Sequence, residues 1–555
     1  MASPPNQTSA SPGHTVEYEK QMDPSTTTKQ EPDLEAGFTS SSEPSATTTL
    51  EGADDKEATK DPNLVTWDGP DDPENPKNWP SKTKWSFTVA VSVFTFISPV
   101  SSAMIAPALA KLGEDLHMTR DIEIELSLSI FILAYAVGPL FFGPASELWG
   151  RVRLLQLSNL WYLAWNLGCG FATNKPEIFI FRFLAGAGGS APLAIGGGCI
   201  SDVWTAEERG KAMGIYTLAP ILGPVVGPIA GGWIAEKTTW RWVFWSSSAL
   251  ALGIQVVGLI WLKESHPPTI LRRRRDRLVK ETGNHELKVY IPQPITPGQP
   301  AASGPDNNSN NSTPKVLLQP DKPPSLLHTI GSAFIRPGRL IATQPIVQVI
   351  ALYMAYLFGV MYLLLATFSN IWSEVYHESR GIGGFNYISI AIGSFVGVFA
   401  NFYYIDRIYK HLKAKNGGVG RPEFRIPSMI VGSATVTVGL FWYGWSVQAR
   451  IHWIMPNLGV AIFSAGTIGC LQSMQTYTVD SYTRYAASAL AAVAIFRSLA
   501  GFAFPLFAPY MYKALDYGWG TSVLAFISIG IGFPAPFIFW LFGPKLRAMS
   551  KYAAG

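Results

Sequence analysis

Two arginine residues lie inside long apolar segments of this sequence, where a charge is costly. Arg182 follows Phe-Ile-Phe, and Arg497 follows Ala-Ile-Phe. A charged side chain at the centre of a bilayer costs at least about 2.5 kcal/mol, so such residues usually serve a function. Arg182 is about five residues from the start of its segment, so it either snorkels to the interface or serves a function inside the membrane. Arg497 lies deeper and needs a partner, for which Asp480 is the candidate, in a substrate cavity or a structural ion pair.

A short loop motif carries a second set of charges. Residues 143–153 read Gly-Pro-Ala-Ser-Glu-Leu-Trp-Gly-Arg-Val-Arg, which places Glu147 four residues before Arg151, with Arg153 close behind. Residues four apart share a helix face, so Glu147 and Arg151 can form an ion pair if the helix continues through them. Such a pair would latch two helix bundles in one state. The alternative is a turn that carries basic residues.

Small residues and prolines alternate in a third motif. Its members are Gly223, Pro224, Gly227, Pro228, Gly231 and Gly232. Glycines spaced by four share one helix face and allow a neighbouring helix to approach closely. The prolines predict kinks on an adjoining stripe.

Other polar residues lie in or near apolar segments. Glu125 comes early in its segment, where we expect an interfacial position, yet it could titrate, while Asp202, Glu207 and Glu208 are expected to be solvated. Candidates for a substrate cavity, or for hydrogen bonds between helices, are Asn370, Gln348, Gln472 and Gln475.

The composition indicates that these residues are held by membrane helices. The chain has 555 residues, of which 48% are hydrophobic and 15% charged, against about 25% charged in soluble proteins. A spanning helix needs about 20 mostly apolar residues. Twelve such segments occur, beginning near Trp85, Glu123, Leu154, Glu177, Lys211, Trp240, Pro345, Phe385, Ile426, Ile451, Tyr485 and Trp519.

The polar segments divide the chain into parts. We expect a disordered acidic tail at 1–82, a six-helix bundle at 83–262 and a linker at 263–342. A second six-helix bundle at 343–543 and a tail at 544–555 complete the chain.

The net charge of +4 hides a strong asymmetry. Residues 1–80 carry a net charge of −11, and the remainder carries +15. Loops after odd-numbered segments hold 8 Lys and Arg residues, whereas loops after even-numbered segments and the carboxyl tail hold 26. Because basic loops stay in the cytoplasm, both termini and the linker are predicted to be cytoplasmic.

Catalytic and cofactor motifs do not stand out. The sequence has no phosphate-binding Gly-Lys-Ser/Thr loop and no His/Cys metal spacing, and its three cysteines lie in apolar segments. We therefore expect no enzyme activity, no cofactor, no metal and no nucleic-acid partner. Transport would have to be secondary.

Taken together, the motifs resemble those of a known family. The loop motif is similar to the loop signature of the major facilitator superfamily, which usually has Asp at the position of Glu147. The Gly-Pro motif resembles the antiporter signature of exporters in that superfamily, and Asn75-Pro-Lys-Asn-Trp79 resembles a motif of fungal drug exporters. The chain is thus identified, over about residues 75–545, as similar to the twelve-span fungal drug:proton antiporters.

This resemblance implies an all-α membrane protein with two six-helix bundles around a central cavity. It assigns Arg182 to proton coupling. It also implies a monomeric plasma-membrane exporter of hydrophobic or amphipathic toxic compounds, driven by protons through alternating access. A polyamine exporter and a proton-coupled uptake symporter stay open as alternatives, although few carboxylates in mid-segment disfavour polyamines.

Overall fold

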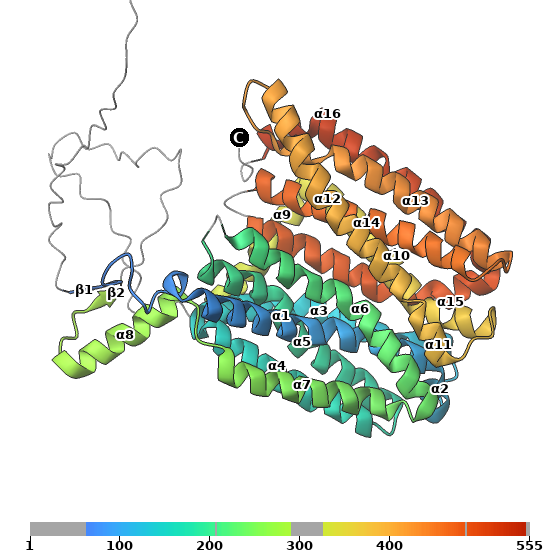
Figure 1. The fold of residues 1–555 in the computed structure, drawn as a ribbon, viewed down its shortest axis with the longest axis horizontal. Helices are drawn as coiled ribbons and strands as arrows, with labels where there is room; N and C mark the ends of the chain where they lie inside the picture. The colour runs from blue at the N-terminus through green and yellow to red at the C-terminus, as the bar shows by residue number, and fades with distance from the viewer. Residues whose placement is uncertain (1–62, 206–207, 290–325, 483–485, 551–555) are drawn as a thin grey trace, which may run out of the picture. The chain divides into compact units, whose positions relative to one another are not determined.

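The computed structural model describes residues 63–205, 208–289, 326–482 and 486–550. The expectations for residues 1–62, for the middle of the linker and for Glu207 lie outside these residues. The secondary structure of the described residues consists of helices and one short pair of strands, joined by loops (Figure 1).

The first half of the fold contains six long helices joined by short loops. They are α1 (Ser81–Met104), α3 (Asp121–Trp149), α4 (Arg151–Phe171), α5 (Lys175–Val203), α6 (Arg209–Lys237) and α7 (Arg241–Trp261), with the short helix α2 (Leu109–Asp115) between α1 and α3. The second half contains α10 (Pro345–Glu374), α11 (Arg380–Phe385), α12 (Ile388–Lys415), α13 (Pro427–Gln448), α14 (Ile454–Ser481), α15 (Ala486–Gly532) and α16 (Pro534–Ala548).

Ten stretches among the described residues are long and apolar enough to cross a membrane. Two further spans complete the predicted twelve. Helix α4 has spanning length, but polar residues such as Asn159 and Asn166 lower its hydropathy. The last stretch, Ser488–Ala548, contains two spans, because the chain leaves helical geometry at Asp516 (φ 53°). The predicted fold class is confirmed.

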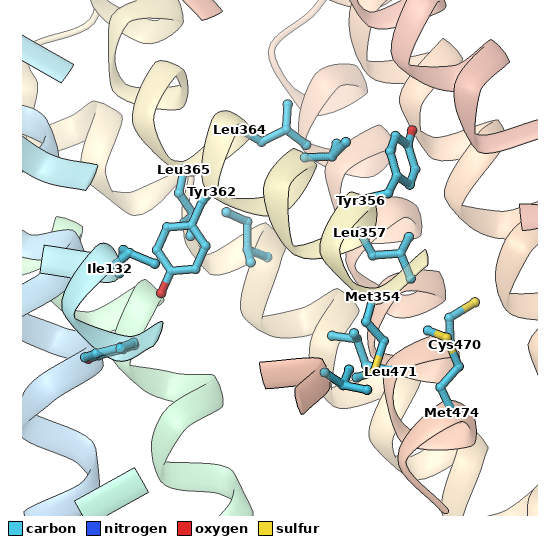
Figure 2. Packing of buried hydrophobic residues seen from close by; sticks show 14 of the residues in the cluster. Ile132, Met354, Tyr356, Leu357, Tyr362, Leu364, Leu365, Cys470, Leu471 and Met474 are labelled. Carbon is cyan, nitrogen blue, oxygen red and sulfur yellow. The ribbon is translucent and has the colours of Figure 1, made fainter. Parts of the chain in front are cut away.

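The halves meet along α3, α6, α10, α11 and α15. Helix α15 packs against both α3 and α10, and α11 packs against α6. One buried apolar cluster continues across the boundary. Figure 2 shows Ile132 of α3 beside Tyr362 of α10, while Met354 of the same helix lies near Leu471 and Met474 of α14. A single helix, α10, therefore contributes to the interface and to the core of its own half.

The segments that flank the first bundle are more ordered than expected. The linker contains α8 (Pro267–Thr282) and α9 (Leu326–Thr343), and β1 (Leu64–Val65) pairs in parallel with β2 (Lys288–Val289). The buried carboxylate of Asp72 accepts backbone hydrogen bonds from Asp68 and Glu74 and pairs with Arg274 of α8 at 2.8 Å. The expectation of disorder up to residue 82 is therefore wrong for residues 63–82, because α8 supplies partners. Helix α16 also continues to Ala548, past the predicted boundary at 543.

The helix bundle has two ends. The basic end carries α8, Arg151 and Arg425, and the opposite end carries α2, α11 and the bend at Asp516.

Candidate functional site

Arg182 is completely buried within the first half. Its guanidinium donates hydrogen bonds to the backbone carbonyls of Ser127 at 3.0 Å and Ser101 at 3.2 Å, and to those of Ser102 and Leu128 at 3.4 Å. Helix α1 ends at Met104, so its last carbonyls lack partners within the helix and are free to accept. The snorkelling alternative is wrong, because the side chain points into the bundle.

Two aromatic rings complete the surroundings of Arg182. Its guanidinium carbon lies 4.6 Å from the centroid of Phe131 and 5.7 Å from that of Phe244. A cation over an aromatic face gains about 0.5–2 kcal/mol. Carbonyls and rings together hold this charge without a carboxylate, and they tie α5 to α1, α3 and α7.

Arg497 of α15 has a different environment. Its guanidinium carbon lies 4.6 Å from the ring of Phe358, and its buried Nε has no hydrogen-bond partner among the described residues. The predicted partner is elsewhere, because Asp480 at the end of α14 pairs with Arg425 at 3.1 Å. The proposed Arg497–Asp480 pair is therefore wrong.

The loop motif forms a different clasp from the one predicted. Helix α3 ends at Trp149, and Gly150 adopts φ +99°, which an L side chain disfavours. This break removes the helical spacing between Glu147 and Arg151. Glu147 is exposed, and Arg151 pairs instead with Asp202 of α5 at 3.2 Å. Asp202 is therefore paired rather than solvated, so the expectation that water surrounds it is wrong.

Further contacts reinforce this clasp. The backbone N–H of Arg151 donates to the Glu264 carboxylate at 2.9 Å, which fixes the start of α4 to the segment after α7. The side chain of Arg153 is exposed. Sequence reasoning missed Glu264, although an acidic residue directly after a spanning helix at a basic end is a signal for such a contact.

The second half has a comparable pair at the same end. Arg425 bonds to Asp480 at 3.1 Å and to Asp406 at 3.0 Å, while Glu423 pairs with Arg547 of α16 at 2.9 Å. Each half is therefore held together at its basic end by one Arg–Asp pair. In the first half the arginine is at the start of α4 and the aspartate near the end of α5. In the second half the arginine lies just before α13 and the aspartate is near the end of α14.

The Gly-Pro motif lies against two neighbours. A Cβ on Gly227 would lie 2.5 Å from the carbonyl oxygen of Val100, and Gly223 and Gly231 face α1 in the same way. Gly232 turns to the second half, where a Cβ would lie 2.5 Å from the carbonyl oxygen of Arg380. Pro224 and Pro228 are buried within the continuous helix α6. The motif therefore permits close packing both within the first half and between the halves.

A cavity of about 380 Å³ lies between the halves at the opposite end. Its walls come from α2, α3, α10 and the part of α15 around the bend, and they include Asp121, Glu125, Asn370, Glu374, Tyr512, Lys513 and Tyr517. Glu125, one turn from the start of α3, is 3% exposed, and its Oε2 has no hydrogen-bond partner among the described residues. Buried carboxylates are normally paired, so this one is an exception that needs an explanation.

The other polar candidates are divided between this cavity and helix contacts. Asn370 lines the cavity. Gln348 donates to the carbonyl of Ile341, and Gln472 accepts from Asn401, so both join neighbouring segments. Gln475 is half-buried on α14. Among the described residues no group of His, Cys, Asp and Glu could hold a metal ion.

The part of the chain that the structure describes has twelve spanning helices in two halves with a cavity between them, which is the architecture of a multi-pass membrane transporter. Residues 91–505 match the model of the Major Facilitator Superfamily. The efflux pump vrtL of Penicillium aethiopicum is 63% identical over 527 residues, covering 95% of this chain and 97% of that protein. The MFS-type transporter penM of Penicillium rubens is 38% identical, covering 90% and 92%. The chain belongs to the major facilitator superfamily and, within it, to the fungal efflux transporters that its motifs resemble.

A solved structure agrees on the fold. The xylose transporter XylE from E. coli, in a partially occluded inward-open conformation, aligns with a TM-score of 0.57 at 15% identity. The match covers 83% of this chain and 99% of that one. At this identity the likeness concerns the fold alone.

Proposed function

We propose that this protein is a secondary active exporter, which exchanges protons for hydrophobic or amphipathic toxic compounds through alternating access. Antifungal drugs and fungal secondary metabolites are the expected substrates. The name of the relative at 63% identity, an efflux pump, supports the direction of transport. The observation that carries the coupling is the unpaired, buried Glu125 carboxyl in a cavity between the two halves.

Contacts between the halves at the opposite end support the alternation. The ammonium of Lys513 lies 2.5 Å from the Asp121 carboxylate, and the N–H of Gly381 donates to the Glu236 carboxylate at 2.8 Å. Both contacts join one half to the other beside α2 and α11. They must break for that end to open, so a change of charge at Glu125, one helical turn from Asp121, can bias the equilibrium.

In this proposal the basic end lies in the cytoplasm and the cavity lies at the outer end of the protein. Positive loop charge favours that orientation. The proton then arrives at Glu125 from outside, where the pH is lower. The remaining assignments, a monomer in the plasma membrane and roles for Arg182, Arg151, Arg153, Glu147 and Arg497 in coupling or gating, are part of the same proposal.

The test uses purified full-length protein in liposomes with an imposed pH gradient. A fluorescent amphipathic compound should move against its gradient, and an uncoupler should abolish that movement. Glu125→Gln should reduce proton-driven flux at least tenfold, whereas Glu123→Gln should leave it within twofold. Glu123 is the matched control, because it lies on the same helix but pairs with Lys175 at 2.7 Å.

Two results would contradict the proposal. Flux that is indifferent to the uncoupler would exclude proton antiport. Accumulation in the same direction as the proton movement would identify an uptake symporter instead.

A further inference from the structure

The linker helix α9 packs against both halves at the basic end of the bundle (Figure 1). Its neighbours are α3 in the first half and α10 and α15 in the second. The ring of Phe334 lies 5.3 Å from that of Phe141 in α3, and Leu340 is buried in the apolar cluster that continues between the halves. One side of α9 is therefore fixed to the bundle.

The position of α9 relative to the membrane follows from the next helix. The spanning helix α10 begins at Pro345, and its last residue, Glu374, lines the cavity at the opposite end. Gln344 between the two helices is extended (φ −113°, ψ 104°) and ends α9. The side chain of Gln348 donates to the carbonyl of Ile341, one of the last of α9, at 2.8 Å. Helix α9 is thus a separate helix attached where a spanning helix enters the membrane.

The opposite side of α9 combines apolar and basic residues. Ile335 is 61% exposed, and Arg336 and Arg339 are exposed as well. Residues three or four apart lie on the same face of a helix, so Arg339 lies one turn from both Ile335 and Arg336. An exposed apolar residue beside basic ones is typical of a helix that lies in the interface between membrane and water.

The two arginines of α9 have no carboxylate partner in the part of the chain that the structure describes, since neither takes part in an ion pair within 4 Å. Arg151 and Arg425 at the same end differ, because each pairs with an aspartate. A guanidinium can donate two parallel hydrogen bonds to a phosphate. Basic residues next to a membrane surface are attracted to anionic lipids. Arg336 and Arg339 are therefore available for the phosphates of lipid headgroups.

We propose that α9 binds anionic phospholipids, with Arg336 and Arg339 at the headgroup phosphates and Ile335 among the acyl chains. This contact anchors the linker to the surface of the membrane. It does not depend on the transported compound or on the direction of transport. The other linker helix, α8, lacks the apolar part of such a site, because its exposed residues are all charged or polar. It serves as the comparison in the experiments.

The first experiment measures lipid binding to the purified full-length protein in detergent by native mass spectrometry. Dioleoyl phosphatidylserine is the anionic probe, and dioleoyl phosphatidylcholine is the zwitterionic control with the same acyl chains. We expect phosphatidylserine to bind at least tenfold more tightly, because only its headgroup carries a net negative charge. Equal binding of the two lipids would overturn the inference.

A pair of double variants tests the assignment to α9. Arg336→Gln with Arg339→Gln should weaken binding of phosphatidylserine at least fivefold and leave that of phosphatidylcholine unchanged. Arg277→Gln with Lys280→Gln removes two exposed charges of the same spacing from α8 and should change binding less than twofold. All four side chains are exposed, so the melting temperatures should stay close to that of the unmodified protein. Equal weakening by both double variants would mean that net charge alone attracts the lipid, and would overturn the inference.

A second experiment tests the position of Ile335 in full-length protein reconstituted into phosphatidylserine-containing nanodiscs. The three native cysteines are buried, so a cysteine introduced at the surface can be labelled selectively. A bimane label on Ile335→Cys should lose at least half of its fluorescence when the nanodiscs contain a doxyl-labelled lipid. The same label on Lys280→Cys in α8 should lose less than a tenth. Absence of quenching at Ile335→Cys, or equal quenching at the two positions, would contradict the membrane position of α9.

Discussion

The two arginines within apolar helices, one in each half, have different surroundings: Arg182 is completely buried, whereas Arg497 is half-buried. Arg182 donates to four backbone carbonyls and lies between two aromatic rings, so every part of its charge has a partner. Arg497 lies against one ring, and its Nε is buried without a partner among the described residues. The same residue type in similar apolar sequence therefore joins several helices through hydrogen bonds in the first half and makes one ring contact in the second. This difference predicts that Arg182 contributes more to stability than Arg497 does.

Replacing Arg182 should have the largest effect. Arg182→Ala removes hydrogen bonds to a charged group, which contribute about 1.5–3 kcal/mol each before compensation, and it leaves a cavity. We expect destabilisation of about 3 kcal/mol or more, seen as loss of monodisperse protein in detergent and a lower melting temperature. Arg182→Lys should rescue little, because an ammonium cannot reach four carbonyls with the planar geometry of a guanidinium. If Arg182→Ala melts at the same temperature as the unmodified protein, the predicted difference in stability between the Arg182 and Arg497 variants is wrong.

Replacing Arg497 should affect transport and leave stability almost unchanged. Arg497→Ala removes a charge that has few partners to lose, so the melting temperature should stay close to that of the unmodified protein. Proton-driven flux in liposomes should fall at least tenfold if the charge meets a ligand during the cycle. A fall in stability as large as that of Arg182→Ala would show that Arg497 is structural as well.

The two Arg–Asp pairs at the basic end also differ between the halves, and the expected effect on stability is smaller. Asp202 and Arg151 are 16% and 14% exposed, whereas Asp480 and Arg425 are 34% and 19% exposed. Because exposed pairs contribute only about 0–1 kcal/mol, Asp480→Asn should change stability little. Asp202→Asn should cost more, because it leaves the better buried Arg151 without its carboxylate. Thermal unfolding of both variants, with exposed Glu147→Gln as control, measures the difference. Equal effects of the two Asp variants would mean that burial does not distinguish the halves.

The position of each charge along the chain was predictable, but its partner was not. Arg182 and Arg497 stand out because any charge within an apolar run does so. Their surroundings depend on helices that are far apart in the sequence. Arg182 donates to backbone carbonyls of α1 and α3. Every residue type has a backbone carbonyl, so the sequence does not indicate which ones accept these hydrogen bonds. The prediction that Asp480 pairs with Arg497 was wrong for a related reason. The fold brings a different arginine, Arg425, to within hydrogen-bond distance of Asp480.

The residues that line the cavity could not be predicted as a group from the sequence either. In the sequence Glu125 and Glu374 are acidic residues near the ends of two apolar segments, and neither suggests a site alone. They share a cavity because α3 begins and α10 ends at the same end of the bundle, next to the bend of α15 at Asp516.

The sequence by itself determined that this protein crosses a membrane about twelve times, in two halves, with its basic loops on one side. Local composition carries that information, because the length of an apolar run and the charge of a loop act within a few turns of helix. Only the tertiary structure decided which charges are satisfied. Hydrogen bonding and ion pairing act over about 3 Å, so they depend on how helices pack rather than on where residues occur in the chain.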